Sequence, residues 1–424
     1  MTALGAAARL PRTGTRRYLA AGTFAGLGVL NIAGFGLAAR QGDAVFALSL
    51  SGNGIQVPGI HVPAAPACFA AGAISIGAGV LYAVADLGRL GRRLVIATVL
   101  TCFLIALLCW ADASSTVGPV NLVDLLQGTV TAAIPLVLGA LSGVMCERSG
   151  VINIAIEGQL ITGAFAAAAV ASLAGVLWFG LIAGSLMGGL VGALLAVFAI
   201  KYRVDQIILG VVINVLAMGM TNYLYDRVMS PYSSTWNTGA FFTPVKIPLL
   251  ASIPIIGPIL FDANIFLYIT YALIIVIQVG LFSSRWGLRV RAVGEHPTAA
   301  DTVGIKVLWN RYRNVILGGM VAGIGGAYLT VGDVGFFSTG MSSGFGYIGL
   351  AAMIFGRWRP LGAVAAALLF GFTRQLQDVL GLLGVPVPSQ VLAMVPYVAT
   401  IIAVAGLVGR VRAPAADGRP YIKS

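Results

Sequence analysis

Charged residues are scarce in this sequence of 424 residues: they make up 9% of it, against 58% hydrophobic residues. Soluble domains carry about a quarter charged residues. The mean hydropathy is +0.95, and apolar runs of about twenty residues, which are typical of transmembrane helices, recur along the chain. The composition excludes a soluble multi-domain protein and predicts an all-α polytopic membrane protein.

Histidine and cysteine are also rare, with two and four residues. His61 and His296 lie far apart in different predicted loops, so no metal site is expected. The cysteines show neither CxxC nor metal-ligand spacing, and they lie in or just after apolar runs. We expect them to pack helices as small residues, without a disulfide framework. They are Cys68, Cys102, Cys109 and Cys146.

Lysine is scarce as well, and none of the lysines follows a glycine, so the sequence has no Walker A motif. The HExxH pattern is also absent. The chain therefore lacks the P-loop means of holding ATP, no bound cofactor is expected, and no enzymatic activity is predicted. The lysines are Lys201, Lys246, Lys306 and Lys423.

The net charge of +12 could indicate nucleic-acid binding, but a membrane protein gathers Lys and Arg in its cytoplasmic loops. When the chain is followed across the membrane, every clear Lys/Arg cluster falls on one side. This predicts about twelve transmembrane or half-spanning helices, both termini in the cytoplasm, and no nucleic-acid partner. The predicted spans are 18–38, 64–85, 94–112, 121–144, 151–172, 176–200, 204–225, 263–282, 314–332, 345–356, 361–376 and 390–408.

The first apolar run follows four arginines, Arg9, Arg12, Arg16 and Arg17. It could be a cleaved signal peptide. An uncleaved first helix is favoured because the run is long and the "AARQGD" after it is a poor cleavage site.

Two spans are predicted to be discontinuous, near 150–160 and at 345–356. The second is too short to cross a bilayer at 1.5 Å per residue. The apolar runs before residue 115 contain few polar residues, and the intramembrane polar residues considered below all follow it. Three regions are therefore expected: a three-helix extension (1–115), a core (116–410) and a cytoplasmic tail (411–424).

Glu157 is the most informative intramembrane residue, because a carboxylate within a span costs at least about 2.5 to 3.5 kcal/mol. It lies four residues after Asn153, so the two share a face if this stretch is helical. Glu157 either lines a substrate path or pairs with, or caps, a neighbouring helix. Asn214, a second buried amide, either bonds between helices or faces the path.

The basic loop 283–313 contains a short predicted helix that starts at Pro297 and ends near Gly304. Such a helix could dock into a groove of a soluble partner. It could instead lie on anionic membrane lipid, held by Arg and Trp side chains.

Four stretches together resemble the permease subunits of bacterial ABC importers for branched-chain amino acids, ribose and nucleosides, and most of all the nucleoside permeases. They are "ERSGVINIAIEG", "VDQIILGVVINVLAMGMTNYL", "WGLRVRAVGEHPTAADTVGI" and "GFGYIGLAAMIFGRWRPLGA". In the second, Asp205 stands where Glu is more usual. The resemblance covers about residues 120–410.

The resemblance implies a multi-pass permease of the bacterial plasma membrane that forms the path for nucleosides or a related simple sugar. It also implies an ATP-binding cassette subunit, a second permease (the same chain or a paralogue) and an extracytoplasmic substrate-binding lipoprotein. Asn153, Glu157 and Asn214 become candidates for the path. The loop that contacts the ATPase would contain Arg291, Gly294, Glu295, Pro297, Ala300, Asp301 and Gly304.

Two other functions remain open. A secondary transporter could use Glu157 as its proton or sodium site. A membrane scaffold would have no transport role.

Overall fold

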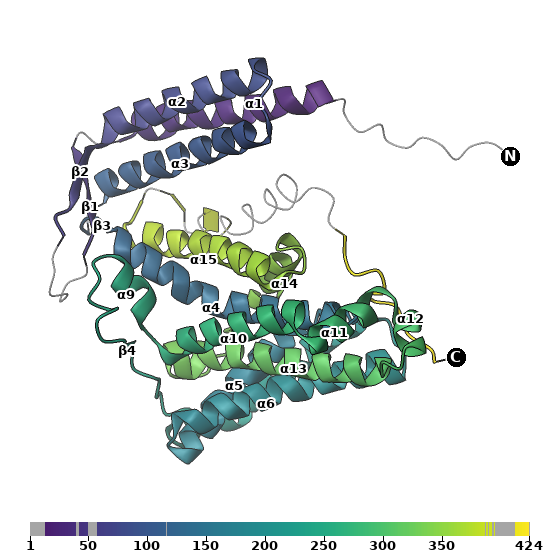
Figure 1. The fold of residues 1–424 in the computed structure, drawn as a ribbon. Coiled ribbons are helices and arrows are strands. Elements are labelled where there is room, and N and C mark those ends of the chain that lie inside the picture. The colour runs from purple at the N-terminus through teal and green to yellow at the C-terminus, as the bar shows by residue number, and fades with distance from the viewer. Residues whose placement is uncertain are drawn as a thin grey trace. The chain divides into compact units, whose positions relative to one another are not determined.

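The computed structural model describes residues 13–39, 42–49, 57–115, 117–385, 387–388, 390–391, 394 and 412–423. In these ranges the chain is mostly helical (Figure 1). Nine of the described helices are long and apolar enough to cross a membrane: Arg17–Gly36, Ala64–Val84, Leu90–Ser114, Leu122–Glu147, Ile156–Ala174, Leu177–Lys201, Gln206–Met229, Ile265–Ser283 and Val307–Val334. The predicted α-helical membrane fold is confirmed to this extent, and the orientation of the termini stays a prediction.

Several predicted boundaries differ from the structure. The predicted span 151–172 begins only at Ile156, and the span 314–332 begins earlier, at Val307. The span 361–376 lies in α15 (Pro360–Leu382), which is not among the nine candidate spans. The run 390–408 falls almost wholly outside the described residues, as do Arg9, Arg12 and Arg410.

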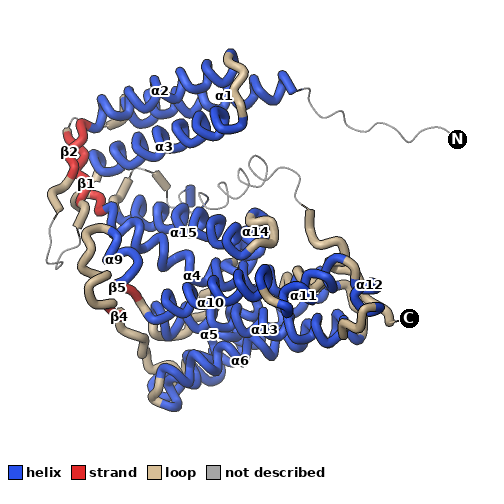
Figure 2. Tube along the Cα trace, in the orientation of Figure 1, coloured by secondary structure: helices blue, strands red, loops and turns tan. Residues whose placement is uncertain are grey.

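The chain divides into two compact units. The first contains Met1–Leu125 and Asp378–Leu392. Its three long helices lie side by side, with a small sheet at one end (Figure 2). The helices are α1 (Thr13–Leu30, continued by the π-helix η1, Asn31–Gly36), α2 (Ala64–Val84) and α3 (Arg89–Ser114). The strands are β1 (Asp43–Ala47), β2 (Ile60–Pro63) and β3 (Val120–Asn121).

The small sheet has the order β2-β1-β3, with β1 antiparallel to β2 and parallel to β3. Asp112, near the end of α3, holds it in place. Its carboxylate accepts hydrogen bonds from the backbone N–H of Val45 (2.7 Å) and of Val120 (2.6 Å). One side chain thus joins two strands to a helix.

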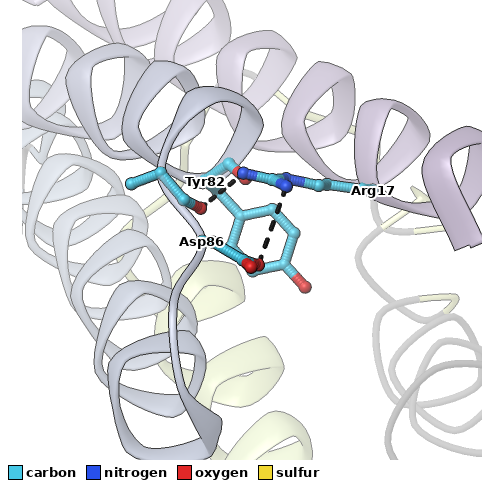
Figure 3. Close-up of polar contacts among 4 residues, drawn as sticks. Arg17, Tyr82 and Asp86 are labelled. Carbon is cyan, nitrogen blue, oxygen red and sulfur yellow. Dashed lines mark hydrogen bonds and ion pairs between the residues drawn. The ribbon is translucent and has the colours of Figure 1, made fainter.

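At the other end of this unit, Arg17 ties α1 to the end of α2 (Figure 3). Its guanidinium donates to the carbonyl oxygens of Tyr82 (2.9 Å) and Ala85, and lies 3.9 Å from the Asp86 carboxylate. The carbonyls in the last turn of a helix lack intrahelical partners, and a cation there also favours the helix dipole.

The second unit contains Leu126–Gln377 and Ala393–Ser424. Its long helices are α4 (Leu122–Glu147), α5 (Ile156–Ala174), α6 (Leu177–Ala196), α7 (Gln206–Leu224), α10 (Ile265–Ser283), α13 (Val307–Ala327) and α15. Three continue as π-helices: η2 (Val197–Lys201) after α6, η3 (Tyr225–Met229) after α7 and η4 (Tyr328–Val334) after α13. Shorter elements are α8 (Ser233–Trp236), β4 (Val245–Lys246), α9 (Ile256–Phe261), β5 (Asp262–Ala263), α11 (Arg285–Glu295), α12 (Pro297–Thr302) and α14 (Phe345–Phe355).

Helices α5, α6 and α13 pack against one another in the second unit. Small residues let their backbones meet. A Cβ atom added at Gly188 of α6 would lie 2.4 Å from the carbonyl oxygen of Gly319 in α13, and one added at Gly326 would lie 2.0 Å from that of Leu160. In a membrane such close approach supplies the dispersion contacts that hold helices together.

Candidate functional site

The segment between α4 and α5 is not helical, which confirms the predicted discontinuity near 150–160, although the predicted span 151–172 begins only after it. Gly150 has a φ of +87°, and its N–H donates to the carbonyl of Glu147, while that of Val151 donates to Cys146. This is how a glycine in the left-handed region ends a helix. Residues 151–155 lie outside regular helix, and α5 starts at Ile156.

The Glu157 carboxylate, at the start of α5, accepts three hydrogen bonds from the chain that leads into α14. Oε1 accepts from the Ser342 hydroxyl (2.6 Å) and the Gly344 N–H (2.9 Å), and Oε2 accepts from the Gly346 N–H (2.7 Å). The first N–H groups of a helix have no intrahelical partners and carry the positive end of its dipole. Glu157 therefore caps α14 from a neighbouring helix.

Helix α14 is a half-span, as its sequence predicts. It has 11 residues, so its length is about 17 Å, roughly half of the ~30 Å hydrocarbon core. Its C-terminal end is followed by Arg357 and Arg359, which we expect at the membrane surface, so its N-terminus is expected at depth. Unpaired backbone groups are not tolerated there, and Glu157 pairs two of them.

Only glycine fits at position 346. A Cβ atom there would lie 2.4 Å from the backbone nitrogen of Glu157 and 2.6 Å from its Cα. The missing side chain lets α14 approach the start of α5 closely enough for the carboxylate to reach the amide. The Gly-rich stretch and the distant glutamate thus form one structural feature.

Asn214, on α7, joins the same region from another side. Its Oδ1 accepts from the Gly158 N–H (2.8 Å), and its Nδ2 donates to the Ile154 carbonyl (2.9 Å) and the Tyr347 hydroxyl (3.2 Å). The amide therefore links the non-helical segment, the first turn of α5 and α14. Of the two alternatives open from the sequence, the bond between elements is observed.

Asn153 does not share a helical face with Glu157, because residue 153 precedes the helix. Its Nδ2 donates to Gln159 Oε1 (3.1 Å) and to the Ser142 hydroxyl of α4 (3.2 Å). Asn153, Glu157 and Asn214 are only 0%, 2% and 3% exposed. They form a buried hub, which we define as these three residues with Gly346, around which α4, α5, α7 and α14 are held.

The basic loop folds as two short helices, α11 and α12. The predicted helix is confirmed: Pro297 is the first residue of α12, and Gly304, with a φ of +83°, follows its end. The preceding α11 was not predicted. A Cβ atom at Gly294, near the end of α11, would lie 2.2 Å from the Arg148 carbonyl oxygen. Helix α11 therefore touches the turn that leads into the hub.

The seven loop residues singled out in the sequence fall into three groups. Gly294 and Ala300 are buried, so they hold α11 and α12 in place. Glu295 and Gly304 are exposed. Arg291, Pro297 and Asp301 are half-buried, and the Arg291 guanidinium lies 5.1 Å from the centre of the Phe282 ring.

Several residues of the site have only weak signals in the sequence. Ser342 and Gly344 lie more than 180 positions from the carboxylate that they bind. The closely spaced glycines Gly344 and Gly346 are the only local sign of a close approach. Trp358, which donates to Glu147 Oε2 (2.5 Å) and accepts at its carbonyl from Arg148 (2.8 Å), carries no such sign.

The chain matches the family described as "Branched-chain amino acid transport system / permease component" over residues 125–405. The match begins within α4, so α1–α3 lie outside it.

Three relatives illustrate the similarity. The guanosine ABC transporter permease protein of Bacillus subtilis is 40% identical over 308 residues, which cover 70% of this chain and 96% of the relative. The nucleoside ABC transporter permease protein of Lactococcus lactis is 38% identical, with 72% and 99% covered. A putative glucose ABC transporter permease protein of Haloferax volcanii is 33% identical, with 60% and 76% covered. No solved structure matches significantly.

Proposed function

Because the chain belongs to this family of permease components, we propose that it forms the membrane path of an ATP-driven importer for nucleosides. The assignment of the cargo depends on one observation: 40% identity to a guanosine permease over 96% of that protein. The match therefore leaves little of the relative's path uncovered. The putative glucose permease is less similar, so a simple sugar is the second candidate.

As a member of this family the chain is a multi-pass membrane permease, and ATP is hydrolysed by a separate subunit in such systems. We propose that α11 and α12 form the platform on which that subunit docks. The exposed part of the platform includes Glu295, His296, Ala299 and Val303, and Val303 is 75% exposed. An exposed apolar residue beside polar ones is typical of the centre of a docking surface.

The arginine and lysine clusters support an orientation with both termini, α11 and α12 in the cytoplasm. The remaining partners follow from the type of system: a second permease, which is a paralogue or the same chain, and an extracytoplasmic lipoprotein that delivers the cargo.

We propose that the path runs beside the hub, and that Asn153, Glu157 and Asn214 act by holding α14 rather than by facing the cargo. Their polar atoms bond to protein groups. Non-helical backbone at membrane depth is tolerated where protein buries it or where it lines a water-filled cavity. The hub thus lies where a path for a polar, uncharged solute can be opened by moving α14.

The alternative of an ion-coupled transporter requires a Glu157 carboxylate that releases its partners to bind a proton or sodium. An uncoupler separates the two mechanisms if cellular ATP is held constant. Uptake should then continue, since ATP drives it; its loss would favour ion coupling.

Uptake of radiolabelled guanosine, uridine and ribose tests the cargo in a strain that lacks this gene and in the same strain complemented. Loss of nucleoside uptake that complementation restores is the expected result. If ribose uptake alone is lost, the cargo is a simple sugar. Unchanged uptake of all three overturns the nucleoside assignment and supports a scaffold.

A further inference from the structure

Residues 412–423, here called the tail segment, lie against α11. The N–H of Ala416 donates to the carbonyl of Gly294 (2.9 Å), and that of Ala415 donates to Glu295 Oε2 (3.2 Å). These are the last residues of α11, directly before the platform turns into α12.

The tail segment also reaches the non-helical segment between α4 and α5. A Cβ atom at Gly418, which has a φ of +72°, would lie 2.6 Å from Cδ1 of Ile152. The Asp417 carboxyl is hydrogen-bonded to Glu147, the last residue of α4. Residues 417 and 418 thus lie against both ends of the turn that leads into the hub.

A third set of contacts joins the tail segment to α12 and α13. The Arg311 guanidinium, in α13, donates to the carbonyl of Arg419 (2.8 Å). Tyr421 is 7% exposed and packs in a cluster with Val293 of α11, Ala300 of α12 and Val307 of α13. A buried aromatic ring supplies a large share of the contact area in such a cluster.

We propose that the tail segment is a coupling element that fixes α11 and α12 to the segment leading into the hub. When the ATPase subunit displaces the platform, the tail segment moves with it and carries the displacement to residues 150–152, and so to Glu157 and α14. This inference rests on the proposed function. It assigns a role to residues 412–423, of which the matched family region, 125–405, contains none.

The geometry favours such a role over that of a loose extension. The platform itself meets the turn at the close approach of Gly294 to Arg148. The tail segment adds a second connection, of hydrogen bonds to Gly294 and Glu295 on one side and the half-buried Asp417 carboxyl on the other. Coupling between two sites needs an element whose position both sites influence. The tail segment contacts both the platform and the turn that leads into the hub.

The first test is Tyr421→Ala in the complete complex reconstituted in proteoliposomes, with Ile422→Ala as the control because Ile422 is 62% exposed. Tyr421→Ala should keep the ATPase subunit bound and ATP hydrolysis within about twofold of wild type, while solute uptake per ATP falls at least fivefold. Unchanged uptake per ATP overturns the inference.

A second test does not depend on the stability of that variant. Ala415→Cys and Glu295→Cys are combined and joined with a short bismaleimide, which leaves the four buried native cysteines unmodified. If the tail segment moves with the platform, the linked complex retains the ATPase subunit and transports at the rate of the unlinked one. Loss of uptake by a linked complex from which the same amount of ATPase co-purifies means that the tail segment must detach, and this also overturns the inference.

The two hypotheses fail separately. If the wild-type complex shows no ATP-dependent uptake, the proposed function fails. If the wild-type complex transports and Tyr421→Ala transports equally well per ATP, only the role of the tail segment fails.

Discussion

Glu157 Oε2 accepts a hydrogen bond from the Gly346 N–H at 2.7 Å, although 189 positions separate the two residues. This bond joins the first turn of α5 to the first turn of the half-helix α14. Polar groups without partners are costly in a membrane. The carboxylate at the start of α5 and the backbone N–H at the start of α14 each supply the partner that the other lacks.

Replacing Glu157 by Ala should lower uptake at least tenfold. The change leaves the Ser342 hydroxyl and the Gly344 and Gly346 N–H groups without their acceptor, at about 1–3 kcal/mol for each unpaired group. Glu157→Gln should be intermediate, because an amide keeps one accepting oxygen. Uptake is compared at equal permease levels with Asp124→Asn, which changes an exposed carboxylate. Full uptake by Glu157→Ala would remove the hub from the mechanism.

Gly346→Ala should be far more damaging than its size suggests, because the added methyl meets the backbone of Glu157. Overpacking of this kind costs about 1–3 kcal/mol, and here it also separates the carboxylate from its donors. Gly219→Ala in α7 is the matched control, with no atom within 4 Å of the added Cβ. Thermal unfolding in detergent and uptake should both be impaired by the first change alone. Equal behaviour of the two variants would contradict the close approach.

Val303→Asp tests the platform, because it places a charge on an apolar residue that the proposed ATPase interface would bury. Burying an unpaired charge is costly, so the amount of ATPase that co-purifies with the permease should fall at least tenfold. Leu249→Asp is the control, since Leu249 is 87% exposed and lies in the loop after β4. If Val303→Asp retains the ATPase, the partner docks elsewhere.

The position of the tail segment should depend on pH through Asp417. Burial raises the pKa of Asp417 from 3.8 to about 7, and the hydrogen bond from Glu147 and the charge of Arg311 only partly oppose this. A raised carboxyl pKa means that the docked state holds the proton more tightly. The stabilisation is complete below about pH 4 and is lost as the pH rises through about 7.

Chymotrypsin cleavage after Tyr421 reports this change, because that residue is buried while the tail segment is docked. The cleavage rate of wild type relative to Asp417→Asn should rise between pH 6 and 8, since the amide does not titrate. The ratio removes the pH dependence of the protease. A constant ratio would show that Asp417 does not control docking.

Local composition predicts the spans well and their partners poorly. The apolar runs, the short helix at 345–356 and the start of α12 at Pro297 follow from hydropathy, length and the fixed φ of proline. The break near 150–160 is predicted too, but the start of α5 at Ile156 is not, because Gly150 ends α4 in the left-handed region and Asn153 bonds back to α4 rather than continuing a helix. Hydropathy averages such residues into the apolar run that follows.

Glu157 shows the same limit of local sequence information. Its depth in an apolar run signals that it has a partner, but the partner residues lie far along the chain and are small and polar, as in many loops. Pairings of this kind depend on tertiary packing, which no local window contains. The tail segment is a further case, because its contacts with α11 and α13 join residues more than 100 positions apart.

The contacts of Tyr421 with α11, α12 and α13 also set an order of events during biosynthesis. Residues 412–423 follow α4–α15 in the chain, so the platform stays incomplete until translation has passed that position. A permease whose synthesis stops earlier would present an unfinished platform to the ATPase subunit. Only chains that have been translated through Tyr421 would then assemble into the importer.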